Sequence, residues 1–197
     1  IISVGMSTLG EIEETLSIYK NHGHNNIILL QCVSNYPCSS ESLNLRVMNT
    51  LRSAFQVPVG FSDHSVDCEA AIVSVALGAK VIEKHFTLDK QLKGPDQKTS
   101  STPDEFASLV YSIRKAEKIL GSPYKYCQNE EKDNLMVSRK SVTLRKEIKK
   151  GKTIQEADLV MKRPGIGLPA NNIPHIIGME ARRNLLKNYQ LKWDDLK

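Results

Sequence analysis

The sequence predicts an α/β protein that contains the C-terminal half of a (β/α)8 TIM barrel and, after it, a small β-rich domain. Between residues 1 and 120, four short apolar segments alternate with four segments of helical pattern, and such regular βα units imply a parallel sheet. Four units are half of an eight-fold barrel. The charge then changes sign. Residues 1–138 hold 13 Lys and Arg against 16 Asp and Glu, whereas residues 139–197 hold 14 against 6, which indicates a second domain.

The four expected strands are short apolar runs at residues 1–4, 26–31, 57–61 and 81–82. The run NIILLQ at 26–31 is typical of a strand that is buried on both faces. Helices are expected at residues 8–19, 45–55, 69–77 and 104–120. The last helix has a strong start, because Thr102 can cap it, Pro103 follows and two acids complete the first turn. An open doubly wound sheet is the alternative fold, but no glycine-rich phosphate loop supports it.

The length of the chain fits only part of a barrel, since a complete one needs about 200 residues or more. The sequence also starts inside an apolar run without an initiator Met, so we expect a fragment that lacks the first half of the barrel. Residues 121–138 form a polar connector, and after residue 139 short β-like pieces at 141–144 and 159–162 alternate with turns. The expected domains are therefore a half barrel at 1–120, a linker at 121–138 and a small domain at 139–197.

The composition, with 40% hydrophobic and 25% charged residues, is typical of a soluble globular protein. No apolar run reaches the roughly 20 residues that span a bilayer. The four cysteines form no CxxC pair, which fits free thiols in a reducing cytoplasm rather than a zinc site. We expect a cytoplasmic protein with no membrane partner. Nucleic acid is not expected either, because Tyr189 and Trp193 are the only aromatic residues of the basic tail. An anionic small substrate or an acidic neighbouring subunit explains its charge.

Two histidines follow neighbouring strands of the predicted sheet, where each strand ends. His64 comes after residues 57–61 and His85 after residues 81–82, 21 positions later. Adjacent strands lie about 4.8 Å apart, so both imidazoles can reach one ion. Water and substrate oxygens would complete the shell, which is the pattern of an open catalytic metal site. Two unrelated, hydrogen-bonded histidines are the other interpretation of this spacing.

Further polar groups gather at the same end of the strands. Asp96 lies in the loop Gly94-Pro95-Asp96, which either holds a carboxylate over the barrel mouth or is an ordinary turn. We expect Asp63 either to orient His64 or to cap the next helix. Hydroxyl groups also lie at or just after strand tips, on Ser3, Ser34, Tyr36 and Ser62. In the tail, Arg163 precedes a Pro-Gly turn that holds its guanidinium ready for a polar ligand.

Several motifs, in a fixed order, carry a resemblance to a known family. They are QCVSNYP, GFSDH, ALGAKVIEKHFTLD, KGPDQKTSSTPDEF and, further on, IKKGKTI with DLVMKRPGIG. Nearly the whole chain resembles the sialic acid synthase (N-acetylneuraminate synthase) family, whose close relatives are the pseudaminic and legionaminic acid synthases. The resemblance implies a (β/α)8 barrel followed by an antifreeze-like SAF domain of β-clip fold, which begins near Ser138.

The resemblance also implies a transferase activity. The family condenses phosphoenolpyruvate with N-acetylmannosamine, through C–O cleavage, to give N-acetylneuraminate and phosphate. It needs a divalent metal, typically Mn²⁺, with Mg²⁺ or Co²⁺ as substitutes. By resemblance, the metal ligands are His64 and His85, and the catalytic residues are His64, His85 and Asp96. The residues implied to contact phosphoenolpyruvate are Ser3, Ser34 and Ser62. Those implied to contact the sugar are Tyr36, Asp96 and Arg163.

Two rivals to this function stay open at the level of the sequence. One is a pseudaminic or legionaminic acid synthase, and the other is a non-catalytic module in which the SAF domain binds carbohydrate. In the family, Arg163 matches a residue that reaches the barrel of the partner subunit, so the resemblance implies a domain-swapped homodimer. The family's phosphate-binding lysines belong to the first half of the barrel, so we expect residues 1–197 to be inactive alone.

Overall fold

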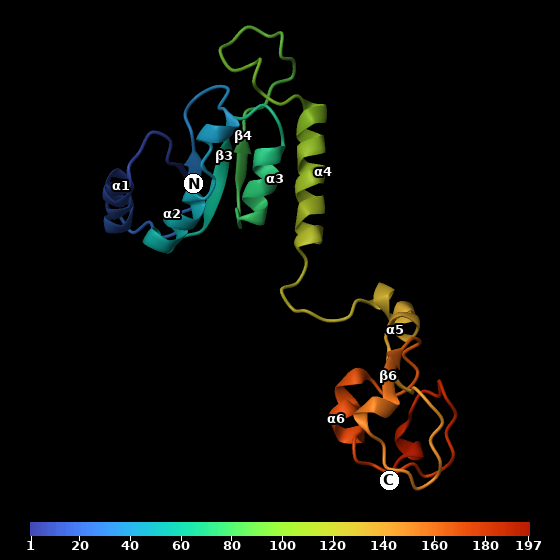
Figure 1. The fold of residues 1–197 in the computed structure, drawn as a ribbon. Helices are drawn as coiled ribbons and strands as arrows, with labels where there is room; N and C mark the ends of the chain where they lie inside the picture. Colours follow the sequence, from blue (N-terminus) through green and yellow to red (C-terminus); the bar gives the residue numbers. More distant parts are fainter. The chain divides into compact units, whose positions relative to one another are not determined.

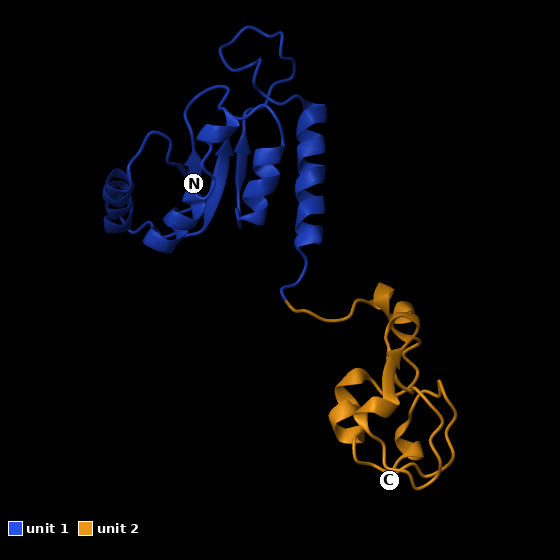
Figure 2. Cartoon of the chain, in the orientation of Figure 1, with its two compact units in different colours: residues 1–123 blue, residues 124–197 orange.

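The computed structural model describes residues 1–197 and divides the chain into two compact units, residues 1–123 and 124–197. Figure 1 shows the ribbon from the N-terminus to the C-terminus, and Figure 2 colours the two units separately. The first unit is an α/β structure and the second is built from short strands, turns and short helices.

The first unit contains one sheet of four parallel strands in the order β1-β2-β3-β4. The strands are β1 (Ile2–Ser3), β2 (Leu29–Cys32), β3 (Val59–Asp63) and β4 (Ile82–Lys84). Each is followed by a helix, namely α1 (Leu9–Asn21), α2 (Val47–Phe55), α3 (Glu69–Ala76) and α4 (Pro103–Leu120). A short 3₁₀ helix, η1 (Ser40–Ser42), lies in the loop between β2 and α2. Strand order equal to chain order, with a helix after every strand, confirms the predicted half barrel.

Sequence explains why these elements form. Thr8 and Thr102 each cap a helix and exchange hydrogen bonds with a glutamate three residues later, which completes a capping box. The two central strands, β2 and β3, are buried at every position, as their continuous apolar sequence predicts. The core between sheet and helices includes Leu29 and Phe61 from the strands and Met48 and Leu51 from α2, all fully buried.

One strand differs from its expected bounds by more than two residues. β2 begins at Leu29, although the apolar run that predicts it begins at residue 26. The physical reason is pairing, since Leu29 is the first residue with partners on both sides, Ile2 in β1 and Val59 in β3. Before it, the backbone makes a local bond from Ile27 N–H to the Asn25 carbonyl. Apolar periodicity alone does not show where the neighbouring strands end.

The second unit has its own hydrophobic core, with Val142, Leu144, Ile148 and Leu191 fully buried. Its regular strands, β5 (Ser141–Leu144) and β6 (Leu159–Lys162), pair antiparallel, as expected for β-like pieces at these positions. The segment expected as a linker contains η2 (Asn129–Glu131) and the helix α5 (Lys132–Ser138). The remaining elements are η3 (Glu156–Asp158), η4 (Ala170–Asn172), α6 (Ile173–Ile176) and η5 (Trp193–Asp195).

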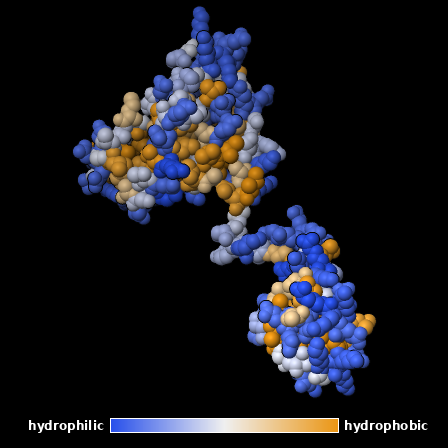
Figure 3. All heavy atoms as spheres, in the orientation of Figure 1, coloured by the Kyte–Doolittle hydropathy of each residue, from blue (hydrophilic) through white to orange (hydrophobic).

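The surfaces of the two units differ in character. Figure 3 shows hydrophobic residues gathered in a broad band on one face of the first unit, whereas hydrophilic residues dominate the visible surface of the second. Fourteen Lys and Arg against six Asp and Glu in residues 139–197 agree with that surface. None of the helices is both long enough and apolar enough to cross a membrane.

Candidate active site

The carboxyl ends of β3 and β4 bring the two predicted histidines together. The ring centroids of His64 and His85 are 5.2 Å apart, and their planes are nearly perpendicular at 85°. Tyr36, from the loop after β2, lies against both imidazoles, with its ring centroid 4.0 Å from that of His64 and 4.9 Å from that of His85. Three aromatic side chains from three successive loops therefore meet at one point, which the sequence predicted only for the two histidines.

His64 is buried, with 8% of its surface exposed, and its orientation is set by the backbone. Its Nδ1 lies 2.8 Å from the carbonyl oxygen of Val33 and 3.7 Å from Cys32 Sγ. A carbonyl oxygen only accepts, so Nδ1 must carry the proton and donate it, and the Nε2 lone pair stays free. The His64 carbonyl in turn accepts a bond from the Cys38 N–H at 2.9 Å. The imidazole is thus fixed in the tautomer that a metal ligand needs.

His85 is more open than His64 and faces the predicted acid. Its Nδ1 lies 3.7 Å from Asp96 Oδ2, and the Asp96 side chain is 46% exposed. The Asp96 carbonyl accepts from the Ser100 N–H at 3.0 Å and from the Ser100 hydroxyl at 2.7 Å, which closes the loop that carries the acid. The Ser101 N–H donates to the His85 carbonyl at 2.8 Å. This loop returns to the end of β4 and holds the Asp96 carboxylate beside His85.

The three predicted serines have different environments. Ser62 is buried on β3, and its hydroxyl donates to Glu83 Oε1 at 2.8 Å. Ser34 is exposed in the loop after β2, and a methyl group placed on Gly5 would lie only 2.2 Å from its Oγ. Ser3 is exposed at the end of β1. Because Gly5 has no side chain, the Ser34 hydroxyl can occupy the space beside it. The sequence alone did not predict that these two residues are neighbours.

Burial, together with nearby acidic groups, raises the pKa of two groups around the histidines. Partial burial, and then the acidic groups of Cys32, Asp96 and Glu83, raise the pKa of the Tyr36 phenol above its ordinary value. Burial is also the main cause that raises the pKa of the Cys38 thiol. Both groups therefore stay protonated at neutral pH, and Tyr36 keeps an O–H that can donate to an oxygen of a ligand.

Asp63 does not cap α3, whose N-cap is Cys68, and it makes no direct hydrogen bond to the His64 ring. Its Oδ1 accepts from the N–H and the hydroxyl of Ser65, at 2.8 and 2.6 Å, and its Oδ2 lies 2.9 Å from Lys84 Nζ. Lys84 was not singled out from the sequence. A signal for the pair was present, because Asp63 and Lys84 are 21 residues apart, the same spacing as His64 and His85.

The donor set at this site fits a divalent cation. The two imidazole rings lie close together with nearly perpendicular planes, and the protonated Nδ1 of His64 leaves Nε2 available as a ligand. No group of three or more His, Cys, Asp or Glu side chains is placed to hold a metal ion. Two imidazoles would leave most of the coordination shell of a divalent cation open, and water and substrate oxygens would take the other positions.

Arg163 lies in the second unit, at the end of β6. Its Nε donates to the Ser138 carbonyl oxygen at 2.8 Å, and the side chain is otherwise exposed. The following loop is packed closely on the residue after α5, since a methyl group on Gly165 would lie 2.8 Å from Arg139 Cβ. The guanidinium is therefore anchored by one nitrogen and keeps its remaining N–H groups for a ligand.

Comparison with known proteins identifies both units. A model of the NeuB family matches residues 1–125, and a model of the SAF domain matches residues 139–197. The N,N'-diacetyllegionaminic acid synthase of Legionella pneumophila is 41% identical over all of this chain and 56% of its own length. The pseudaminic acid synthase of Campylobacter jejuni is 36% identical, over 99% of this chain and 57% of its own.

A solved structure agrees with this assignment. The N-acetylneuraminic acid (sialic acid) synthetase of Leptospira borgpetersenii, crystallised with citrate, is 40% identical and has a TM-score of 0.61. That comparison covers 68% of this chain and 47% of the crystallised one. The chain thus spans about half the length of the curated relatives it matches.

Proposed function

Because the chain belongs to the NeuB family, we propose that it supplies the C-terminal half of the barrel and the SAF domain of a nonulosonic acid synthase. The proposed reaction joins phosphoenolpyruvate and N-acetylmannosamine to give N-acetylneuraminate and phosphate. The observation that carries this proposal is the pair His64 and His85, 5.2 Å apart between ring centroids, with Tyr36 against both and Asp96 beside His85. Relatives named as synthases of sialic, legionaminic and pseudaminic acids support it.

We propose His64 and His85 as the ligands of a divalent metal, Mn²⁺ in the first place and Mg²⁺ or Co²⁺ as alternatives. When bound, the metal would supply Lewis acidity toward the aldehyde oxygen of the open-chain sugar. The protein's own share is orientation. The Val33 carbonyl holds the His64 ring, and the Asp96 carboxylate lies at the exposed edge of His85, where it can accept hydrogen bonds from sugar hydroxyls.

The remaining proposed contacts divide between the two substrates. The hydroxyl groups of Ser3, Ser34 and Ser62 would bind phosphoenolpyruvate, and the protonated phenol of Tyr36 would donate to the sugar. Arg163, whose exposed N–H groups suit a polar ligand, would contact the sugar from the SAF domain of a partner subunit. That role makes a domain-swapped homodimer part of the proposal.

The bond changes in the proposed reaction balance without any redox partner. The C3 carbon of phosphoenolpyruvate attacks the aldehyde carbon of the sugar and forms the new C–C bond, and the aldehyde oxygen gains a proton. Water adds at C2, and the C2–O bond to phosphate then breaks, so that phosphate leaves with that oxygen and C2 becomes a ketone. We place this reaction in the cytoplasm, without a nucleic acid or a membrane as partner.

A legionaminic acid synthase is the second candidate. The observation that favours it is the 41% identity with the synthase of Legionella pneumophila over the whole of this chain. The two candidates share the reaction and the histidines. They differ in the sugar, which carries one acetamido group in the first case and two in the second.

The test is a panel of sugars offered to the full-length protein that contains these residues. Phosphate release from phosphoenolpyruvate is measured with Mn²⁺ and with N-acetylmannosamine, the diacetamido precursor of legionaminic acid or that of pseudaminic acid. We expect turnover with N-acetylmannosamine, and a preference for a diacetamido sugar would select the second candidate. Absence of turnover with all three sugars, in a protein that binds phosphoenolpyruvate, would overturn the proposal.

A further inference from the structure

One buried ion pair joins the two strands that carry the histidines, one position before each histidine. The register of β3 and β4 pairs Ser62 with Glu83 and Asp63 with Lys84. Because side chains alternate along a strand, Asp63 lies on the same face as Phe61, which belongs to the core between sheet and helices. Ser62 lies on the opposite face, and the same alternation turns His64 and His85, which follow Asp63 and Lys84, to that face. The pair is therefore directly behind the histidines and does not enter the site.

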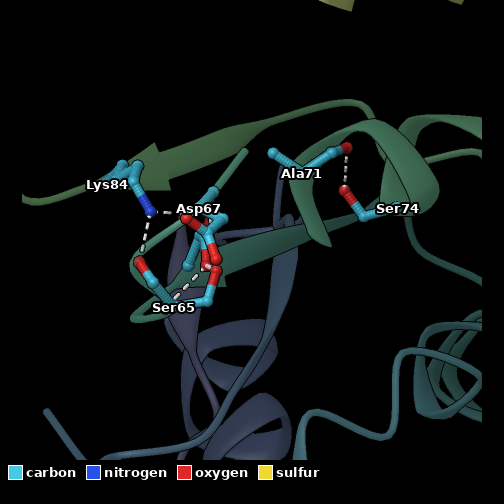
Figure 4. A network of polar contacts seen from close by, with 6 residues as sticks. Ser65, Asp67, Ala71, Ser74 and Lys84 are labelled. Atoms are coloured by element: carbon cyan, nitrogen blue, oxygen red, sulfur yellow. Dashed lines mark hydrogen bonds and ion pairs between the residues drawn. The ribbon is translucent and has the colours of Figure 1, made fainter. Parts of the chain in front are cut away.

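The contacts of this pair close a small loop of bonds around His64. Lys84 Nζ is 2.9 Å from Asp63 Oδ2. It also donates to the Ser65 carbonyl oxygen at 2.6 Å (Figure 4). Asp63 Oδ1 accepts from the Ser65 N–H and hydroxyl. Lys84, the residue before His85, thus binds the side chain of the residue before His64 and the backbone carbonyl of the residue after it.

The burial of the pair indicates that its role is more than stability. The side chains of Lys84 and Asp63 are 3% and 0% exposed. Desolvation of two charges offsets much of their attraction, and replacement of a buried ion pair by apolar side chains is often neutral for stability. What a pair with four directional contacts does supply is a fixed geometry at the two strand tips.

We propose that Asp63 and Lys84 are positioning residues that set the separation and orientation of His64 and His85 for a divalent cation. This inference rests on the proposed function, because it assumes that the two histidines bind a metal. Neither residue touches the metal or the substrates. They act through the strand ends, in the way that groups behind metal ligands commonly tune affinity by about 10- to 100-fold.

The test compares metal binding by variants of the full-length protein. Lys84→Met alone would leave a buried carboxylate without its cation, so the informative variant is the double substitution Asp63→Asn with Lys84→Met, which removes both charges at nearly constant volume. The matched control is Arg52→Met. Arg52 is also a partly buried base, and it donates to the Leu77 carbonyl at 2.9 Å, in the loop that leads into the other end of β4. Mn²⁺ affinity is measured from the electron paramagnetic resonance of free Mn²⁺, and ligand geometry from the visible spectrum of bound Co²⁺.

We expect the double variant to unfold in urea near the wild-type midpoint, to bind Mn²⁺ about 10- to 100-fold more weakly and to show an altered Co²⁺ spectrum. Arg52→Met should lower the urea midpoint and leave both metal measurements unchanged. Wild-type affinity and spectrum in the double variant, together with loss of binding in His64→Ala, would overturn the positioning role alone. Equal Mn²⁺ affinity of wild type and His64→Ala would overturn the proposed function, and this inference with it.

Discussion

At the scale of single residues, Gly5 shows how a missing side chain places a functional one. A Cβ at this position would meet Ser34 Oγ at 2.2 Å and Cys32 Sγ at 3.3 Å. In Gly5→Ala the Ser34 hydroxyl must rotate away, and the hydrogen bond that we propose between it and phosphoenolpyruvate would be lost. We expect the KM for phosphoenolpyruvate to rise by about tenfold, the size of one charge-assisted hydrogen bond, with a smaller change in kcat.

The control for this variant is Gly10→Ala. Gly10 lies in α1, and a methyl group placed on it would have no neighbouring atom within 4 Å, so the substitution adds the same atom in open space. Its KM should equal that of the wild type, and its helix should gain about 0.5–1 kcal/mol in stability. A wild-type KM in Gly5→Ala would show that Ser34 does not bind phosphoenolpyruvate.

Asp158, in the second unit, makes the stability of that unit depend on pH. Burial alone would raise the pKa of this carboxyl, but Lys146 at 2.7 Å, the Gln155 N–H and the charge of Lys152 lower it below its ordinary value. Because the folded pKa lies below the unfolded one, the stability that this group contributes is complete above the unfolded pKa, about 3.9, and is lost as the pH falls through the folded pKa.

We therefore expect Asp158→Asn to be less stable than wild type at pH 7, with the difference in free energy of unfolding shrinking below about pH 4. Trp193 is the only tryptophan of the chain and lies in this unit, so its fluorescence in urea reports the transition. Glu156→Gln, at an exposed carboxylate two residues away, is the control and should change little at either pH. A constant difference between Asp158→Asn and wild type from pH 7 to about pH 2.5 would contradict the assignment.

At the scale of elements, the close approach of β3 and β4 depends on Gly60. A Cβ there would lie 2.3 Å from the Val81 carbonyl oxygen and 2.6 Å from Leu30 Cδ2. The first of these atoms belongs to the backbone and cannot rotate away, so the strands must separate. We expect Gly60→Ala to lose about 1–3 kcal/mol of stability in urea unfolding and to bind Mn²⁺ more weakly, because His64 and His85 lie at the tips of these strands. Unchanged stability would show that the strands tolerate a wider spacing.

Sequence patterns predicted the elements well where one face of each is apolar. The helix α4, with Thr102, Pro103 and Glu105 at its start, carries its own signals and has its expected end at Leu120. The bounds of β2 depended on its neighbours, and no local signal in NIILLQ shows that pairing begins at Leu29. The same limit applies in the site. The 21-residue spacing predicted that His64 and His85 would meet, but the Val33 carbonyl is a backbone atom that sequence patterns do not distinguish.

The contact of Tyr36 with both imidazoles could not be predicted from the sequence either. Its motif marked it as a sugar contact by resemblance, yet the loop that returns its ring to 4.0 Å from His64 is irregular and has no periodicity to interpret. The contact between Asp63 and Lys84 could in principle be predicted from the sequence. These residues have the same 21-residue spacing as the histidines and are paired in the register of the parallel strands β3 and β4. Strand register thus constrains which residues on β3 and β4 are neighbours, whereas no such rule places a ring that an irregular loop carries.

At the scale of the whole molecule, the sheet of the first unit leaves β1 and β4 each with one neighbouring strand. The proposed substrate contacts of the first unit lie at or after the carboxyl ends of its strands, whereas the resemblance implies that the phosphate-binding lysines belong to the first half of a barrel. We expect residues 1–197 alone to release no phosphate from phosphoenolpyruvate and N-acetylmannosamine, with the full-length protein as the positive control. Turnover by residues 1–197 would contradict that expectation.

Whether His64 and His85 together hold a catalytic metal is decided by a Mn²⁺ titration of the full-length protein. His64→Ala and His85→Ala are titrated beside wild type and beside His175→Ala, a control histidine in the second unit. We expect each of the first two substitutions to abolish both Mn²⁺ binding and phosphate release, and His175→Ala to retain both. Mn²⁺ affinity equal to wild type in His64→Ala and His85→Ala would contradict this expectation.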